Sequence, residues 1–143
     1  MSKPKKVRNP FTNYQRRDEY GAWLGYKLAS FDRKKNKASL TIILRKDHTS
    51  SAGRVHGGVI SALFDATCGL AVFTTMGPED FCSTVELKVN YFSPIEIGDQ
   101  LICQAEVVFR GNRLCSVQAF IRHKGKRAPV AMASATFYVV KKK

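Results

Sequence analysis

The segment from Gly57 to Met76 restricts the fold of this chain more than any other segment. It is apolar on nearly every side of a helix, through Val59, Ile60, Ala62, Leu63, Phe64, Ala66, Leu70, Ala71, Val72 and Phe73. A helix that is apolar all round belongs inside a structure and not on its surface. Gly77 and Pro78 end the segment, because glycine allows a left-handed exit and proline cannot continue a helix. We therefore expect one long, buried central helix.

This segment does not have the pattern of a membrane span, which needs about 18 or more consecutive apolar residues. Polar residues interrupt it at Ser61, Asp65, Thr67, Thr74 and Thr75. No apolar stretch follows the charged N-terminus, so no secretory signal is expected. We expect a soluble, cytoplasmic protein that does not insert into membranes.

The four cysteines are widely spaced and stand among apolar residues, at Cys68, Cys82, Cys103 and Cys115. They form no C-x-x-C pair and have no metal-ligand spacing. We therefore expect buried free thiols, with neither a metal site nor a cofactor.

Strand patterns surround the helical segment. Two strands, at residues 23–31 and 37–45, precede it and are joined by a turn at residues 32–36. Four more follow, at residues 85–91, 101–109, 114–123 and 130–140, with turn residues between them. The order is strand–strand–helix–strand–strand–strand–strand. It predicts an α+β domain in which an antiparallel sheet wraps around the central helix.

We expect a single domain at residues 11–140, with a short helix or turn within residues 11–20. A flexible basic arm at residues 1–10 precedes it, and a basic tail at residues 141–143 follows. The net charge of +13 suggests nucleic acid or an anionic membrane as a partner. These two ends hold seven of the 24 Lys and Arg residues and no acidic residue, which leaves +6 for residues 9–140. No helix-turn-helix, zinc-finger or RNP-type motif is present, so nucleic-acid binding is not favoured.

Asp65 is the one charged residue between Gly57 and Met76. An ionised carboxylate in apolar surroundings costs several kcal/mol unless it is paired or hydrogen-bonded. Two interpretations remain open at this stage. Asp65 is either a structural residue that bonds backbone or a core arginine, or a general base or nucleophile.

His56, Gly57 and Gly58 stand where the helix is expected to begin. The first N–H groups of a helix lack intrahelical partners, and glycine lets a ligand carbonyl approach them closely. The same residues also fit a purely structural role, with glycines that give room for packing. Gly57 and Asp65 are eight residues apart, about 12 Å along a helix. If both serve one reaction, they should come from two subunits of a dimer.

The run from Arg54 to Asp65, RVHGGVISALFD, resembles the signature of hotdog-fold acyl-CoA thioesterases of the phenylacetate-pathway (PaaI) type. The similarity extends from residues 9–11 and 24–25, through residues 85–91, to residues 131–138, about nine-tenths of the chain. The spacing of His-Gly-Gly and Asp within one apolar helix is the most specific part of it.

This resemblance implies a thioesterase that hydrolyses a fatty or aromatic acyl-CoA to the free acid and CoA. The Gly57 N–H would polarise the thioester carbonyl, and Asp65 of the partner subunit would act as base or nucleophile. His56 would orient the thioester and Thr84 the water. Ser50 departs from the Asn or Gln that many relatives carry to hold substrate or water. The remaining substrate contacts would come from Gly58, Leu63, Phe64 and Asn90.

Basic residues at the late turns are candidates for the phosphates of CoA, because the planar guanidinium of arginine matches phosphate oxygens. They are Arg110, Arg113, Arg122, Lys124, Lys126 and Arg127. The alternative is that they are solvated turn residues that aid solubility. The resemblance also implies a homodimer that assembles into a homotetramer. A non-hydrolytic acyl-CoA binding or sensing module on the same fold is the main competing function.

Overall fold

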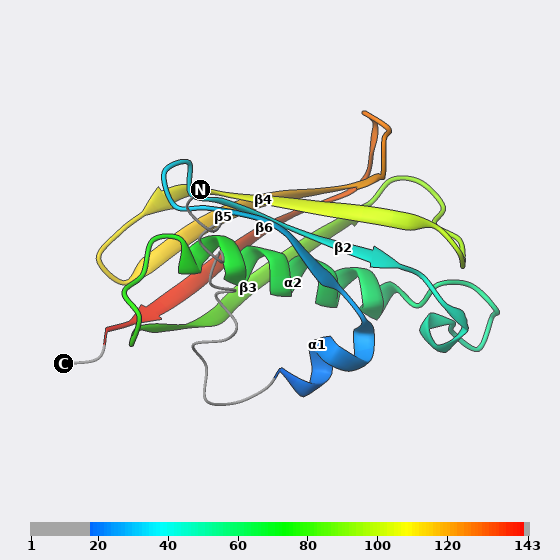
Figure 1. Ribbon diagram of the computed structural model, residues 1–143, viewed down its shortest axis with the longest axis horizontal. Coiled ribbons are helices and arrows are strands. Elements are labelled where there is room, and N and C mark those ends of the chain that lie inside the picture. Colours follow the sequence, from blue (N-terminus) through cyan, green and yellow to red (C-terminus); the bar gives the residue numbers. More distant parts are fainter. Residues whose placement is uncertain (1–17, 142–143) are drawn as a thin grey trace, which may run out of the picture.

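A computed structural model of the chain describes residues 18–141 (Figure 1). The expected arm at residues 1–10 and most of the expected tail at residues 141–143 lie outside this range. The helices are α1 (Glu19–Leu24) and α2 (Gly57–Phe73), and a 3-10 turn, η2, spans Lys46–His48. The strands are β1 (Lys27–Asp32), β2 (Lys37–Ile43), β3 (Phe81–Tyr91), β4 (Gln100–Arg110), β5 (Leu114–His123) and β6 (Pro129–Val140).

All six strands form one antiparallel sheet in the order β1-β2-β4-β5-β6-β3. The hairpins β1–β2, β4–β5 and β5–β6 join neighbouring strands, as the turn residues predict. β3 instead pairs with β6, from Phe81 opposite Val140 to Tyr91 opposite Ala131, so the connection from β3 to β4 crosses over the sheet. β3 is therefore an edge strand, with no strand on its outer side within residues 18–141.

α2 lies along one face of this sheet, and α1 lies on the side of α2 away from the sheet (Figure 1). The buried face of α2 carries Val59, Ile60, Leu63, Phe64, Thr67, Cys68, Leu70, Ala71 and Val72. The α+β architecture with a sheet around one long helix is thus confirmed. The expectation of a helix buried on every side is wrong for a single chain, because the sheet covers only one face. Small residues and Asp65 leave the other face partly exposed, at Ser61, Ala62, Asp65, Ala66 and Gly69.

Several boundaries differ from those expected: β2 ends at Ile43 and not at residue 45, and β3 begins at Phe81 and not at residue 85. α2 ends at Phe73, and Thr74 caps it with a backbone N–H that donates to the carbonyls of Ala71 and Val72. Trp23 and Leu24 belong to α1 and not to the first strand. A short helix forms there because Asp18 caps its first turn by accepting from Gly21 N–H. Gly25 ends the helix at φ 86°, a left-handed conformation that glycine adopts without steric cost.

The cysteines are free thiols, as expected. Cys68, Cys103 and Cys115 are buried and Cys82 is half-buried. Burial raises the pKa of Cys103 to about 12, so this thiol is a core residue and not a nucleophile. None of the helices in residues 18–141 has the length and apolar character to cross a membrane.

Candidate active site

The fold brings Asp65 and Thr84 together from different elements. Asp65 lies on the open face of α2, and Thr84 lies on the edge strand β3. The Thr84 hydroxyl donates a hydrogen bond of 2.7 Å to Asp65 Oδ1. Asp65 is half-buried and Thr84 is exposed, so this carboxylate is within reach of solvent or a ligand. Within residues 18–141 the other Asp65 oxygen accepts no hydrogen bond, and a carboxylate held in this way is suited to act as base or nucleophile.

Two further groups near Asp65 show how its charge acts on its surroundings. Burial, a hydrogen bond to Asp18 and the charges of Asp18 and Asp65 raise the pKa of the Tyr26 phenol well above its usual value. Burial, Cys115 and Asp65 raise the pKa of Cys82 to about 12. Both neighbours are therefore neutral at pH 7.

The start of α2 forms the second part of the site. His56 is the N-cap of the helix, and its Nδ1 accepts a 2.8 Å hydrogen bond from Gly58 N–H. Because a backbone N–H can only donate, Nδ1 carries no proton, and the ring proton of neutral His56 is on Nε2. His56, Gly57 and Gly58 are all exposed. The Gly57 N–H has no hydrogen-bond partner within residues 18–141, so it and the His56 Nε2–H are both available to a ligand carbonyl.

A tyrosine from β3 holds Gly57 from the other side. Tyr91 Oη donates to the Gly57 carbonyl at 2.8 Å and lies 2.8 Å from Ser61 Oγ. Since the Tyr91 hydroxyl gives its proton to Gly57, the Ser61 hydroxyl is the donor of the second bond. The first turn of α2 is thereby attached to the end of β3.

A cleft of about 620 Å³ opens beside this helix start. Gly57 and Tyr91 line it, together with Arg54, Ile60, Ile95, Glu96 and Ile97 among others. Asp65 is not part of the lining. Asp65 is eight residues further along α2, about 12 Å from Gly57. One chain therefore does not bring these two groups to the same carbonyl.

Residues 52–130 match the thioesterase superfamily, which is more than half of the chain. The chain belongs to the thioesterase superfamily. A Pseudomonas aeruginosa protein with the name "Putative esterase PA0474" is 32% identical over 111 residues, which cover 76% of this chain and 81% of the relative. Acyl-coenzyme A thioesterase 13 from Mus musculus is 25% identical over 109 residues, or 69% of this chain and 77% of the mouse protein.

Solved structures of similar fold agree with this assignment. A mutant form of the phenylacetic acid degradation protein PaaI from Thermus thermophilus gives a TM-score of 0.75 at 25% identity and covers 85% of this chain and 98% of its own. The smu.793 protein from Streptococcus mutans, bound to acetyl CoA, gives a TM-score of 0.74 at 25% identity, with 83% and 91% covered. The expected PaaI-type hotdog fold is confirmed.

Other residues that the sequence singled out in this thioesterase-superfamily chain have different surroundings. Ser50 is half-buried in the loop before α2, where its N–H donates to the Arg54 carbonyl. Asn90 is exposed on β3, opposite Met132 of β6. Leu63 and Phe64 are fully buried between α2 and the sheet. In a single chain they offer no surface to an acyl group, because their side chains point into the core.

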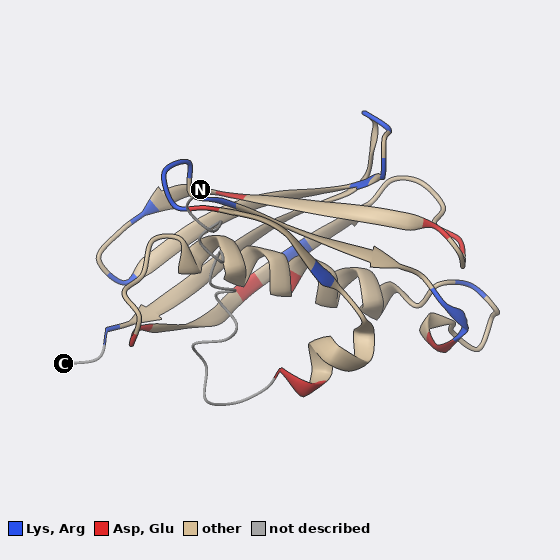
Figure 2. Cartoon of the chain, viewed as in Figure 1, with Lys and Arg blue, Asp and Glu red and all other residues tan. Residues whose placement is uncertain are grey.

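The basic turn residues do not form one cluster. Arg110 and Arg113 lie at the β4–β5 hairpin, while Arg122 and Lys124 lie at the β5–β6 hairpin, at the opposite end of the sheet (Figure 2). Arg110 is engaged within the chain, since its Nε donates to Thr75 Oγ1 at 2.9 Å. Lys124, Lys126 and Arg127 are exposed, and their hairpin is joined to the start of β4 by the Lys124 N–H, which donates to the Gln100 carbonyl.

Sequence patterns did not indicate Tyr91 and Arg54 as site residues in the thioesterase-superfamily chain. By its pattern, Tyr91 is the last apolar residue of an alternating strand, and Arg54 is one of many basic residues in loops. The position of Tyr91 beside Gly57 depends on the pairing that places β3 next to α2, whereas Arg54 lies there because it precedes α2 by three residues. The only clue to them in the sequence is that each stands next to a segment already assigned to the site.

Proposed function

We propose that this chain is an acyl-CoA thioesterase, which hydrolyses a fatty or aromatic acyl-CoA to the free acid and CoA. The observation that carries the proposal is the half-exposed Asp65 carboxylate, held at 2.7 Å by Thr84 in a chain of the thioesterase superfamily. The mouse relative is named an acyl-coenzyme A thioesterase, and the Streptococcus mutans structure is bound to acetyl CoA. Both names support a CoA thioester as the substrate.

Asp65 supplies the reactive group in either of two ways. As a general base it takes a proton from water while the water oxygen attacks the thioester carbon. The C–S bond then breaks, and CoA leaves as a thiolate that takes up a proton. As a nucleophile the carboxylate attacks the carbon itself, expels the thiolate and forms a mixed anhydride that water hydrolyses. Thr84 orients the carboxylate in both cases.

Gly57 stabilises the negative charge that develops on the carbonyl oxygen. Its N–H is at the positive end of α2, where the helix dipole favours an anion. One such donor typically contributes ~10²–10³ to the rate. His56 lies next to it with the proton on Nε2, and this N–H orients the thioester. The neighbouring cleft, with Ile60, Ile95 and Arg54 in its lining, receives the part of the substrate beside the thioester.

The reaction requires Gly57 and Asp65 from two subunits, because about 12 Å separates them along α2. Two surfaces support a homodimer of this kind. The outward face of α2 carries small residues, and the outer edge of β3 is long and partly apolar, with Val85 60% exposed and Phe81 48% exposed. A second copy that pairs along β3 would cover an edge that otherwise invites association. It would place the two copies of α2 next to each other.

The phosphates of CoA are expected at the β5–β6 hairpin, which lies at the same end of the molecule as the start of α2 (Figures 1 and 2). Lys124, Lys126 and Arg127 are exposed there, and the Arg122 side chain stays close by through its bond to the Arg127 carbonyl. Arg110 and Arg113 are at the far end of the sheet. They are therefore less suited to the CoA bound at the same Gly57.

The test is release of CoA from a panel of acyl-CoA substrates, followed with a thiol-reactive dye. The wild type should hydrolyse at least one chain length or aromatic acyl group. Asp65→Asn keeps the shape and the bond from Thr84 but removes the charge, and should lower kcat at least about a hundredfold. Binding of acyl-CoA without CoA release by the wild type would favour the non-hydrolytic binding module and overturn the proposal.

A further inference from the structure

The His48 imidazole is the most deeply buried titratable group near the start of α2, with 1% of its surface exposed. Both ring nitrogens have partners. Nδ1 accepts from Arg45 N–H at 3.1 Å, and Nε2 lies 2.9 Å from the Leu24 carbonyl. Since a backbone N–H can only donate and a carbonyl only accept, the ring is neutral and carries its proton on Nε2. His48 thus connects its own turn, η2, to the C-terminus of α1.

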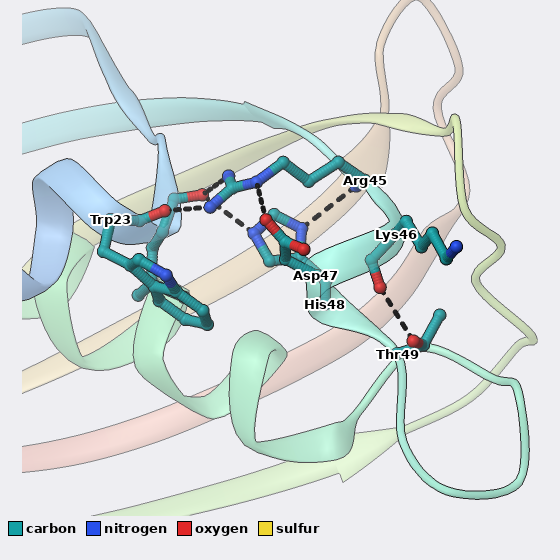
Figure 3. Close-up of polar contacts among 7 residues, drawn as sticks. Trp23, Arg45, Lys46, Asp47, His48 and Thr49 are labelled. Atoms are coloured by element: carbon teal, nitrogen blue, oxygen red, sulfur yellow. Dashed lines mark hydrogen bonds and ion pairs between the residues drawn. The ribbon is translucent and has the colours of Figure 1, made fainter.

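Arg45 strengthens the same connection (Figure 3). Its guanidinium donates to the carbonyls of Trp23 and Leu24, the last two residues of α1. It also lies over the Trp23 ring, 5.5 Å from the ring centroid. The Leu24 carbonyl accepts from both Arg45 and His48, so it keeps one donor if the bond from His48 Nε2 is lost. Within residues 18–141, the Arg45 N–H has no acceptor besides His48 Nδ1.

The backbone of His48 reaches the proposed catalytic helix. The His48 carbonyl accepts a 2.8 Å hydrogen bond from His56 N–H, and Thr49 and Val55 form a β-bridge next to it. His56 is the N-cap of α2 and the residue directly before Gly57. The ring fixes η2, and the carbonyl of the same residue fixes the peptide that precedes the Gly57 N–H.

We propose that His48 is a positioning residue for the oxyanion donor, which aligns the Gly57 N–H through the bond from His56 N–H to its own carbonyl. This inference rests on the proposed function and adds to it a residue that does not touch substrate. A donor displaced by a fraction of an ångström weakens a bond that forms fully only in the transition state. The effect therefore belongs in kcat, with KM little changed.

Two substitutions separate the ring nitrogens. His48→Asn puts an amide oxygen close to the place of Nδ1 and keeps the acceptor for Arg45 N–H. His48→Gln puts the amide nitrogen close to Nε2, which keeps the donor to Leu24 and leaves Arg45 N–H without its partner. We expect His48→Asn to stay within about threefold of the wild-type kcat, and His48→Gln to lose about tenfold or more at similar KM. Asp47→Asn is the control in the same turn, because Asp47 is exposed and the amide oxygen can still accept from Arg45 Nε, which lies 3.5 Å from Asp47 Oδ2, so kcat should stay unchanged.

Hydrogen exchange of the His56 amide is the second readout, and it does not depend on turnover. Exchange should be faster in His48→Gln than in His48→Asn or Asp47→Asn. Wild-type kcat and wild-type exchange in both His48 variants would overturn the inference. So would equal losses of kcat in the two variants that follow their thermal stability, since this is the pattern of a merely structural residue. If the wild type itself hydrolyses no acyl-CoA, the proposed function fails, while the exchange result still reports on His48.

Discussion

At the scale of single residues, hydrogen bonds fix the orientation of a few polar groups around the start and the open face of α2. Thr84 holds one oxygen of Asp65, His56 receives the Gly58 N–H on Nδ1, and Tyr91 ties the Gly57 carbonyl to β3. Each bond orients a group that the proposed reaction uses. Of these residues, Thr84 allows the simplest test because only its hydroxyl is involved.

Thr84→Val replaces the hydroxyl by a methyl group of similar size and removes the bond to Asp65 Oδ1. We expect kcat for acyl-CoA hydrolysis to fall about tenfold, since a hydrogen bond to a charged group is worth a little more than a neutral one. Steady-state kinetics of Thr84→Val and Thr84→Ser measure this. Thr84→Ser keeps the hydroxyl and should restore most of the rate. Equal rates in wild type and Thr84→Val would remove Thr84 from the site.

His48 also makes stability depend on pH. Burial, with help from the charge of Arg45, lowers the pKa of His48 below its usual value. Between the unfolded pKa near 6.5 and the lower folded pKa, the unfolded chain binds more protons than the folded one. The free energy of unfolding should therefore fall as the pH decreases through this window, and change little on this account above about pH 7.

Urea denaturation at several pH values between 5 and 8 measures this dependence. His48→Asn cannot titrate in this range, so its free energy of unfolding should vary less with pH than that of the wild type. An identical pH dependence in the two proteins would contradict the role given to the buried imidazole.

At the scale of elements, α2 combines a core face with an open face. Leu63 and Phe64 fill the space against the sheet, whereas Ser61, Ala62 and Asp65 face away from it. The open face carries the proposed chemistry, and the core face keeps it in place. This division places Leu63 in the core and not in an acyl pocket, and it can be tested by stability.

Leu63→Ala should lower the free energy of unfolding by about 2–5 kcal/mol, because it removes buried methyl groups and leaves a cavity. Leu63→Met conserves volume and should cost less than about 1.5 kcal/mol. Chemical denaturation of the three proteins measures both. A Leu63→Ala protein as stable as the wild type, but with changed acyl-chain preference, would show that this side chain lines the substrate pocket after all.

Elements were predictable from the sequence where the signal is local. The alternation in residues 85–91 and the turn at residues 110–113 each depend on neighbouring residues, and the structure has a strand and a hairpin there. The pairing of β3 with β6, and so the place of Tyr91 beside Gly57, depends on contacts between distant segments. The role of His48 was not predictable for the same reason, since its partner Leu24 is 24 residues away. The open face of α2 was missed because apolar and small residues look alike in a hydropathy pattern.

At the scale of the whole molecule, the proposed reaction needs more than one chain. The fold holds Gly57 and Asp65 in fixed positions on one rigid helix, so no rearrangement short of unfolding α2 brings them together. The basic residues behind the charge of +13 are also spread out, over the two ends of the sequence, the three hairpins and the loop beside the cleft. In the proposed homodimer, a second copy along β3 would supply the missing half of each site.

The mass in solution, from light scattering coupled to size exclusion, should be that of a dimer or a multiple of it. Val85→Lys places a charge on the exposed edge of β3 and should shift the protein towards monomers with a parallel loss of activity. Val108→Lys on β4, where the side chain is also 60% exposed, makes the same change of charge away from the edge of β3 and is the control. A monomeric wild type with full activity would contradict the two-subunit site.

The most direct test of the composite site mixes two inactive proteins. Gly57→Pro removes the N–H at the first helical position, where proline is well tolerated, and His56 before it already has the extended backbone that proline requires. Asp65→Asn removes the charge. After subunit exchange of equal amounts, half of the dimers are hybrids and each has one intact site, so the mixture should show about one quarter of wild-type activity. Activity no higher than that of the separate variants, with exchange demonstrated, would contradict a site shared between two subunits.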